Sequence, residues 1–153
     1  MKTELYAAVH AAEFPAQALL RMRTDIAAEP AAVLDGTPPL ETVCSLNRAA
    51  RLAGVELGMT RLEAEAVPGL RLLVRCLESE RGARSILLEA AAHFSPRIEE
   101  ASHGSACICL LDIAGTERLF GPPQTLAEHL RGALAAAGFR ASIAVSASFH
   151  TAR

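Results

Sequence analysis

The sequence predicts an α+β fold in which helices cover a sheet, with a long insertion after the first strand. Two segments of helical periodicity alternate with short apolar runs of strand length, and a stretch with its own turn and cap signals interrupts them. The chain has 153 residues, of which 51% are hydrophobic and 21% are charged. This composition is sufficient for the core of one ordinary domain and excludes intrinsic disorder.

The first strand is expected at residues 5–10, an apolar run whose pairing partners must come from far downstream. The next long element is a helix over residues 77–94, which ends before Pro96. Its apolar residues recur at helical spacing: Ala83, Leu87, Ala90 and Phe94. This helix is therefore expected to face the core.

A hairpin is expected after this helix. Residues 97–101 alternate as a half-buried strand, and residues 102–105 have the composition of a turn. Residues 106–113 are almost continuously apolar, which is typical of a strand buried on both faces.

The last two predicted elements complete the order of strands and helices outside the insertion. A second helix is expected to open at Pro122-Pro123, with Thr125 and Glu128 at the spacing of a capping box, and to end at Gly138. A final strand over residues 140–146 then gives β-α-β-β-α-β, the order of the ferredoxin-like split motif, with right-handed crossovers.

The insertion, residues 11–77, is too long for a simple connection and is expected to form a subdomain. Its predicted strands are residues 31–34, 41–44 and 70–74. Ser45 and Thr60 are expected to cap two short helices, which end before Gly54 and Pro68.

Charge and cysteine content limit the function classes. The formal charge is −2, from 17 acidic and 15 basic residues, so any contact with nucleic acid must be local. The four cysteines show neither CxxC spacing nor a histidine at zinc-ligand spacing, which predicts reduced thiols. The first residues lack a signal-peptide pattern and no apolar run reaches membrane-spanning length, so a cytoplasmic protein without membrane contact is expected.

Several motifs follow one another along the chain: Asn47-Arg48-Ala49-Ala50-Arg51, Gly54-Val55, Gly58-Met59, residues 94–99, residues 111–115 and residues 142–146. In sequence and order they resemble the Y-family (UmuC/DinB-like) lesion-bypass DNA polymerases. The resemblance covers essentially the whole chain. It implies a palm-like ferredoxin-fold core from residues 1–10 and 78–153, truncated at its C-terminus, and a small, mostly helical, fingers-like insertion from residues 11–77.

Polymerases of this family hold two magnesium ions with carboxylates, one on the first strand and an adjacent Asp-Glu pair in the hairpin. The first-strand position is occupied by Ala8 or His10, and a histidine is a poor ligand for magnesium, which prefers oxygen. The resemblance therefore leaves this chain without the first carboxylate.

The residues that stand at the positions of the family's Asp-Glu pair can be identified by counting along the hairpin from either end. Counting forward from the turn places Gly104 and Ser105 at the Asp-Glu pair, whereas counting back from the following Leu-Asp motif places Cys107 and Ile108 there. Neither count supplies an acid. We therefore expect no catalytic residue, no metal site and no cofactor.

The fingers signature leaves a weaker candidate site. In the family a Tyr and an Arg of this helix hold the incoming triphosphate; here the positions are Arg48 and Arg51, three apart and hence on one helical face. With Asn47, they are candidates for a weak nucleotide-phosphate or DNA contact. The alternative is that both arginines are solvated and only cover the subdomain surface.

Residues 112–121, Asp-Ile-Ala-Gly-Thr-Glu-Arg-Leu-Phe-Gly, resemble the catalytically inactive ImuB-like branch of the family. That resemblance implies a scaffold or adaptor in translesion synthesis and mutagenesis induced by DNA damage, as part of the SOS response. It also implies DNA, an error-prone replicative-type polymerase, a sliding clamp and a recombinase-like accessory protein as partners, reached through regions C-terminal to residue 153.

Two alternatives remain open. The chain could be an active DNA-directed DNA polymerase that needs magnesium and uses relocated ligands such as Glu13, Glu99 and Asp112. It could also be a ferredoxin-like interaction domain in which the fingers motifs are coincidental. The missing first-strand acid and the number of ordered motifs favour a non-catalytic Y-family homologue over both.

Overall fold

The computed structural model describes residues 4–147. The chain folds into two compact units, with boundaries after Ala12 and after Gly82. We call residues 4–12 and 83–147 the split unit, and residues 13–82 the inserted unit. Both boundaries lie a few residues beyond those expected from the sequence, and the second lies inside helix α4 (Leu77–Ala92).

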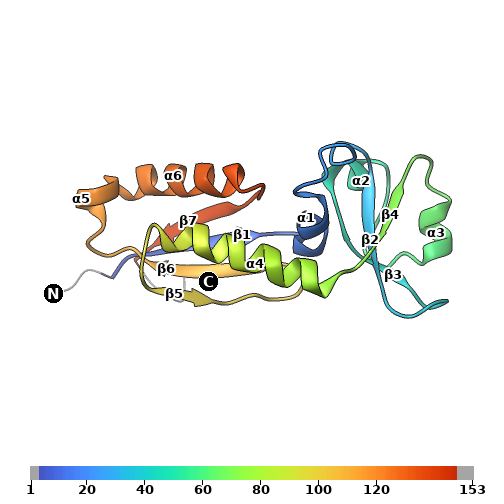
Figure 1. Ribbon diagram of the computed structural model, residues 1–153, viewed down its shortest axis with the longest axis horizontal. Helices are drawn as coiled ribbons and strands as arrows, with labels where there is room; N and C mark the ends of the chain where they lie inside the picture. Colours follow the sequence, from blue (N-terminus) through green and yellow to red (C-terminus); the bar gives the residue numbers. More distant parts are fainter. Residues whose placement is uncertain (1–3, 148–153) are drawn as a thin grey trace. The chain divides into compact units, whose positions relative to one another are not determined.

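The split unit contains a four-stranded sheet. Its strands are β1 (Tyr6–Ala11), β5 (Ile98–Glu100), β6 (Cys107–Asp112) and β7 (Ser142–Ser146). The strand order is β5-β6-β1-β7, and all neighbouring strands are antiparallel. Together with α4 and α6 (Pro123–Ala136) this is the ferredoxin-like arrangement predicted from the sequence (Figure 1).

Alternation along the strands separates the two faces of this sheet. Ala7, Val9 and Ala11 on β1 are fully buried, and they pair with the equally buried Leu111, Cys109 and Cys107 of β6. The helices bury stripes of their own: Ala83, Leu87 and Ala91 on α4, and Leu126, Leu130 and Leu134 on α6. These buried sets form the core, and the helix α6 packs on β7.

Helix α6 begins differently from the expectation. The predicted capping box of Thr125 and Glu128 does not form; Pro122 is the N-cap and no side chain bonds the first turn. The physical reason is Pro123 at the first helical position, which has no N–H to satisfy and a preset φ. The other end is as predicted, because Gly138 follows the helix with φ 89°.

The loop before α6 contains an unpredicted four-residue helix, α5 (Glu117–Phe120). The Phe120 ring lies 5.1 Å from the ring of Phe94, which follows α4. The side chain of Phe120 therefore anchors the loop to the unit.

The inserted unit is built on a three-stranded mixed sheet. Its strands are β2 (Ala31–Asp35), β3 (Thr42–Leu46) and β4 (Arg71–Val74), in the order β3-β2-β4. Strand β2 pairs antiparallel with β3 and parallel with β4. Its helices are α1 (Phe14–Leu20), α2 (Arg48–Leu52) and α3 (Arg61–Glu65). The three strands match the sequence expectation closely, but α1 was not predicted.

Both faces of this small sheet are covered. Leu34 and Val43 pack in one cluster with Ala50 of α2 and Ala64 of α3. Alternate residues of β2 face the other way, where Val33 packs with Ala16 of α1. The insertion is thus a layered domain with its own core rather than a set of surface helices.

Polar contacts close the helix ends of this unit. Thr60 and Glu63 form the predicted capping box at α3. The predicted cap at Ser45 is wrong: α2 is capped by Asn47, because Ser45 remains paired in β3 opposite Val33. Across the part of the chain that the structure describes, no helix combines the length and apolarity needed to span a membrane.

The core assignment predicts a contrast between two leucines of the split unit. Leu130→Ala removes a fully buried side chain, so the free energy of unfolding should fall by about 2–5 kcal/mol. The control Leu119→Ala alters a side chain that is 80% exposed and should stay within about 0.5 kcal/mol of the parent. Urea unfolding followed by circular dichroism measures both; equal effects would contradict the assignment.

Candidate functional site

The open face of the split-unit sheet carries the expected metal positions. Tyr6, Ala8 and His10 alternate with the buried side of β1, and they pair with Asp112, Leu110 and Ile108 of β6. Ala8 and Leu110 are buried in a small apolar cluster, whereas His10 is exposed. Of the two first-strand candidates, only His10 is therefore accessible to a ligand.

The strand pairing also separates the two ways of counting the hairpin. Gly104, with φ 60°, and Ser105 lie in the turn that precedes β6. Cys107 and Ile108 lie on β6 itself, opposite Ala11 and His10. Of these four residues only Ile108 lies directly opposite His10; Cys107 lies opposite Ala11, and neither Gly104 nor Ser105 is paired with β1.

These residues do not fit a magnesium site. Ile108 offers no donor atom, and Cys107 faces the buried side of the sheet with 0% exposure. Burial raises the pKa of the Cys107 thiol, and it raises the pKa of the neighbouring Cys109 to about 12, so both thiols are protonated at neutral pH. Hard cations prefer several charged oxygens, and neither Cys107 nor Ile108 supplies one.

The three acids proposed as relocated ligands do not form a group that could hold a metal ion. The Asp112 carboxylate accepts a hydrogen bond from Ala114 N at 3.1 Å and lies 3.3 Å from Arg97 Nη1. Glu99 is exposed opposite Leu110. Glu13 belongs to the inserted unit. Among residues 4–147, no three His, Cys, Asp or Glu side chains form a group able to hold a metal ion.

In the inserted unit, Asn47 holds the local structure together. Its Oδ1 accepts hydrogen bonds from Ala50 N at 2.9 Å and from Ala31 N at 3.0 Å, and its Nδ2 donates to Glu29 O at 2.7 Å. One side chain thus caps α2 and fixes the start of β2. Both lone-pair sites of the oxygen are used by the fold, which leaves Asn47 little capacity to contact a ligand.

The two candidate arginines on α2 differ in their surroundings. Both are exposed, but Arg48 has no ion pair with any described residue, whereas Arg51 Nη2 lies 3.4 Å from Glu13 Oε1. The structure therefore leaves Arg48 as the freer cation of the pair.

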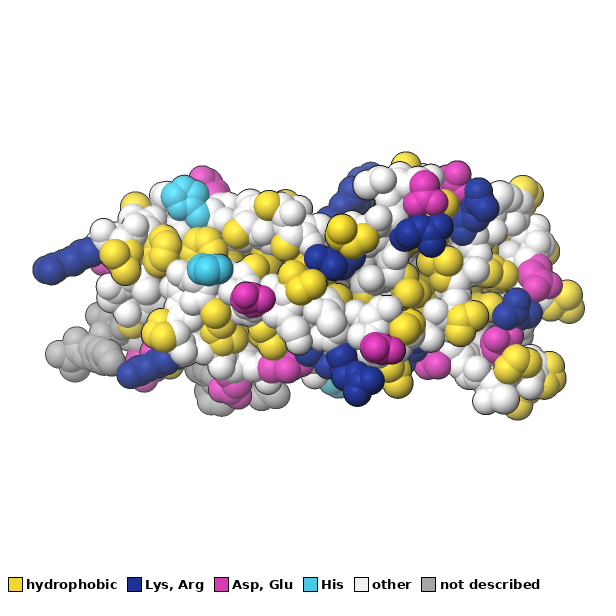
Figure 2. Space-filling view, viewed as in Figure 1, with side chains coloured by type: hydrophobic (Ala, Val, Ile, Leu, Met, Phe, Trp, Pro, Cys, Tyr) yellow, Lys and Arg dark blue, Asp and Glu magenta, His cyan; other side chains and the backbone are white. Residues whose placement is uncertain are grey.

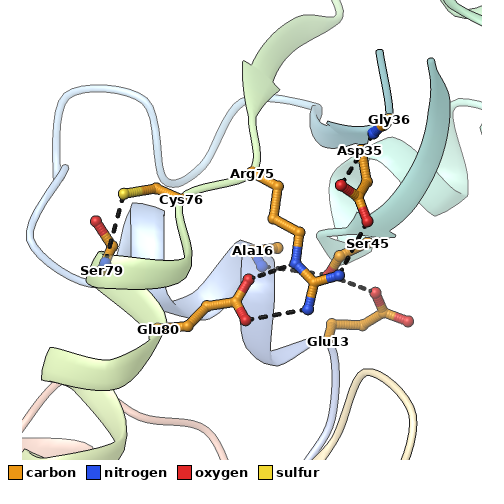
Figure 3. Close-up of polar contacts among 9 residues, drawn as sticks. All are labelled: Glu13, Ala16, Asp35, Gly36, Ser45, Arg75, Cys76, Ser79 and Glu80. Carbon is orange, nitrogen blue, oxygen red and sulfur yellow. Dashed lines mark hydrogen bonds and ion pairs between the residues drawn. The ribbon is translucent and has the colours of Figure 1, made fainter.

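The sequence indicated Glu13 only as a possible metal ligand and did not place it beside the arginines of α2. Its Oε2 accepts a hydrogen bond from Ser45 Oγ at 2.7 Å (Figure 3). The same oxygen accepts a hydrogen bond from Leu46 N at 2.9 Å. Its backbone has φ 51°, a left-handed conformation that costs a non-glycine residue about 1–3 kcal/mol. The hydrogen bonds of the carboxylate offset that cost.

Other arginines of the inserted unit are structural. Arg75 Nη1 lies 3.0 Å from Asp35 Oδ2, and its Nε donates to Glu80 at 2.8 Å (Figure 3). These bonds raise the pKa of Arg75, chiefly through the hydrogen bond to Glu80. Arg61 pairs with Glu41 and Arg71 pairs with Glu29 in the same way. Their guanidinium groups hold strands and helices together.

The comparisons with known proteins agree with this fold. The insertion ternary complex of Dbh DNA polymerase superposes with a TM-score of 0.76 at 19% identity, covering 93% of this chain and 42% of that one. DinB from Sulfolobus solfataricus superposes with a TM-score of 0.74 at 18% identity, with the same coverage of 93% and 42%. This chain thus spans about two fifths of the length of either structure.

The fold is therefore that of these polymerase structures, in agreement with the resemblance of the sequence motifs. The sequence model of the impB/mucB/samB family matches residues 9–153, and the chain belongs to this family. A search of the curated proteins found no match.

The contacts of Asn47 predict a structural rather than a ligand-binding role. Asn47→Ala should lower the free energy of unfolding of the inserted unit by about 1–3 kcal/mol, because the cap is lost and the Ala31 N–H loses its acceptor. Amide hydrogen exchange at Ala31 and Ala50 should accelerate. The control Arg48→Ala should change neither quantity; a stable Asn47→Ala chain with unchanged exchange would refute this role.

Proposed function

We propose that this chain is a non-catalytic Y-family module that acts as a scaffold or adaptor in translesion DNA synthesis. The split unit corresponds to the palm expected at residues 1–10 and 78–153, and the inserted unit to the fingers expected at residues 11–77. The observation that carries the proposal is the pairing of His10 with Ile108, where paired carboxylates would have to stand.

The chemistry of phosphoryl transfer explains why this substitution matters. Magnesium ions activate the attacking hydroxyl and neutralise the triphosphate, and they need a cage of carboxylate oxygens. An imidazole beside an aliphatic side chain cannot provide it. The rival function, an active polymerase with relocated acids, lacks support because Glu13 and Asp112 are already bonded within their own units.

The ImuB-like resemblance of residues 112–121 extends the proposal to partners. A scaffold of this branch would connect DNA, an error-prone replicative-type polymerase, a sliding clamp and a recombinase-like accessory protein during damage-induced mutagenesis. We propose the cytoplasm as the place of this function.

A weak DNA or nucleotide-phosphate contact is assigned to α2. Arg48 forms no ion pair with a described residue, so its guanidinium is available to a phosphate. Elsewhere on the visible face, Arg side chains are interspersed with Asp and Glu and form no continuous basic area (Figure 2). A local contact, rather than a broad electrostatic footprint, agrees with the net charge of −2.

The proposal predicts that the protein carrying this chain shows no template-dependent nucleotide incorporation with Mg²⁺ or Mn²⁺. The reason is the missing carboxylate cage on β1 and β6. Primer extension measures it. Incorporation above background that Asp112→Asn abolishes would contradict the proposal and favour the enzyme with relocated ligands.

A metal titration of this chain tests the missing carboxylate cage directly, without any contribution from other domains. Opposite residues in an antiparallel pair have Cβ atoms about 4.5–5.5 Å apart, so the double variant His10→Asp/Ile108→Asp should gain a saturable Mn²⁺ site. The parent chain should show none on this face. The matched control His10→Asn/Ile108→Asn, which has the same shape without charge, should behave like the parent.

The DNA contact predicts unequal effects of the two arginines. Arg48→Ala should reduce the slope of log K against log salt by about 0.7 for single strands or about 0.9 for duplex DNA. Arg51→Ala should reduce it less, because Glu13 already neutralises that guanidinium. Fluorescence anisotropy over a salt series measures both slopes; equal effects, or no binding at low salt, would show that the contact is absent.

A further inference from the structure

An open groove lies between α4 and α6 of the split unit, and its volume is about 480 Å³. Hydrophobic side chains gather between these two helices on the face that Figure 2 draws. The groove is separate from the expected metal positions, which lie on the open face of the sheet. The residues that line it include Ile86, Glu89 and Ala90 of α4, His93 directly after it, and Ala133 and Ala136 of α6.

The groove exists because small side chains face it from both helices. Larger side chains of the same helices, Leu87 on α4 and Leu134 on α6, are fully buried in the core. Ala90 and Ala133 line the groove instead, and an alanine side chain ends at Cβ. Packed helices keep their axes about 8–10 Å apart, a distance that larger side chains normally fill. The sides of α4 and α6 that face the groove therefore leave room for side chains of another molecule.

The groove has the length and the periodicity that suit a docked helix. Its α4 side is formed by residues at i, i+3, i+4 and i+7, starting from Ile86. They share one side of the helix over two turns, or about 11 Å. A helix laid along this row contributes anchors at the same spacing, which is the pattern of helix-in-groove recognition. Three large aliphatic side chains would fill the space beside Ala90 and Ala133.

The size of the groove decides between a partner helix and a second copy of this chain. Two turns of α4 by one interhelical spacing make an area of roughly 11 Å by 10 Å, far below the roughly 800 Å² that each partner buries in a stable complex. A symmetric dimer built on this groove alone would therefore be unstable. A short helix of another protein needs only such a row of anchors and would form a transient contact.

Glu89 gives the groove a negative charge. Its side chain is exposed, and it forms no ion pair with any residue between positions 4 and 147. Among the described residues that line the groove it is the only carboxylate, and most of the others are apolar. Docking of an apolar ridge excludes water around this carboxylate. A helix that brings a Lys or Arg to it is therefore favoured, and an acidic helix is repelled.

We propose that this groove docks an amphipathic helix of a partner protein, with three large aliphatic side chains in the groove and a Lys or Arg beside Glu89. The contact joins a protein partner to the split unit itself. It goes beyond the proposed function and does not depend on it, because neither the metal positions nor α2 takes part.

Selection from a peptide library tests the proposal without assuming the sequence of the partner. Peptides with a helix-favouring frame and one randomised face are displayed on phage and selected on the immobilised chain. The selected peptides should carry Leu, Ile or Met at i, i+3 or i+4, and i+7, with a Lys or Arg at one fixed position. Selection on the Glu89→Lys variant should replace that cation by Asp or Glu.

Two substitutions on α6 form a matched pair. Ala135 and Ala136 are both exposed, but of the two only Ala136 lines the groove. Ala136→Phe fills the groove and should weaken the binding of a selected peptide by about tenfold or more, measured by fluorescence anisotropy. Ala135→Phe adds the same ring outside the groove and should change the affinity by less than about twofold. Circular dichroism checks the fold of both variants; if Ala136→Phe does not fold, the charge reversal at Glu89 decides by itself.

Each of three results would overturn the proposal. The first is that no peptide is enriched on the parent chain over the folded Ala136→Phe chain. The second is that the selected peptides lack a fixed charged position, or that its sign stays the same on Glu89→Lys. The third is a dimer of the parent chain in analytical ultracentrifugation that Ala136→Phe dissociates, which would assign the groove to a second copy. None of these results bears on primer extension, so the proposed function is tested separately.

Discussion

The pairing of β1 on both of its edges is the constraint from which the split unit follows. This strand is bonded antiparallel to β6 on one side and to β7 on the other. Because side chains alternate with a period of two, the full burial of Ala7, Val9 and Ala11 leaves Ala8 and His10 on the opposite face. A shift by one residue would exchange the two sets, so the position of His10 opposite Ile108 is fixed by core packing and not by local preference.

The inserted unit depends on a different principle, which is internal neutralisation. Its arginines are distributed over strands and helices, and most of those described find an acid within the unit: Arg23, Arg51, Arg61, Arg71 and Arg75. Such pairs contribute modestly to stability when exposed, but they remove cations from the surface field. The unit is therefore rich in guanidinium groups, but few of them remain unpaired and able to attract a polyanion.

Elements with a strong local signal could be predicted from the sequence, and elements set by distant contacts could not. The stripe of α4 and the capping box of Thr60 are local patterns. The capping box forms as predicted, and the stripe agrees with the structure except at Ala90, which is half-buried while Ala91 is fully buried. Helix α1 has no such signal, since its N-cap is the left-handed Glu13 without a capping side chain. Ser45 has the right chemistry for a cap, but its strand pairing prevails. The Glu13–Ser45 bond joins residues 32 positions apart, and no spacing rule indicates it.

The chain order of the β1 partners has a consequence for synthesis. Strand β1 ends at Ala11, and its first partner, β6, begins at Cys107. At the usual elongation rates of roughly 5–20 residues per second, β1 leaves the ribosome about 5–20 s before it can pair. The inserted unit, by contrast, contains all of its own strands between Glu13 and Gly82. We infer that it matures first, and that the unpaired apolar β1 is the segment a chaperone would have to shield in the meantime.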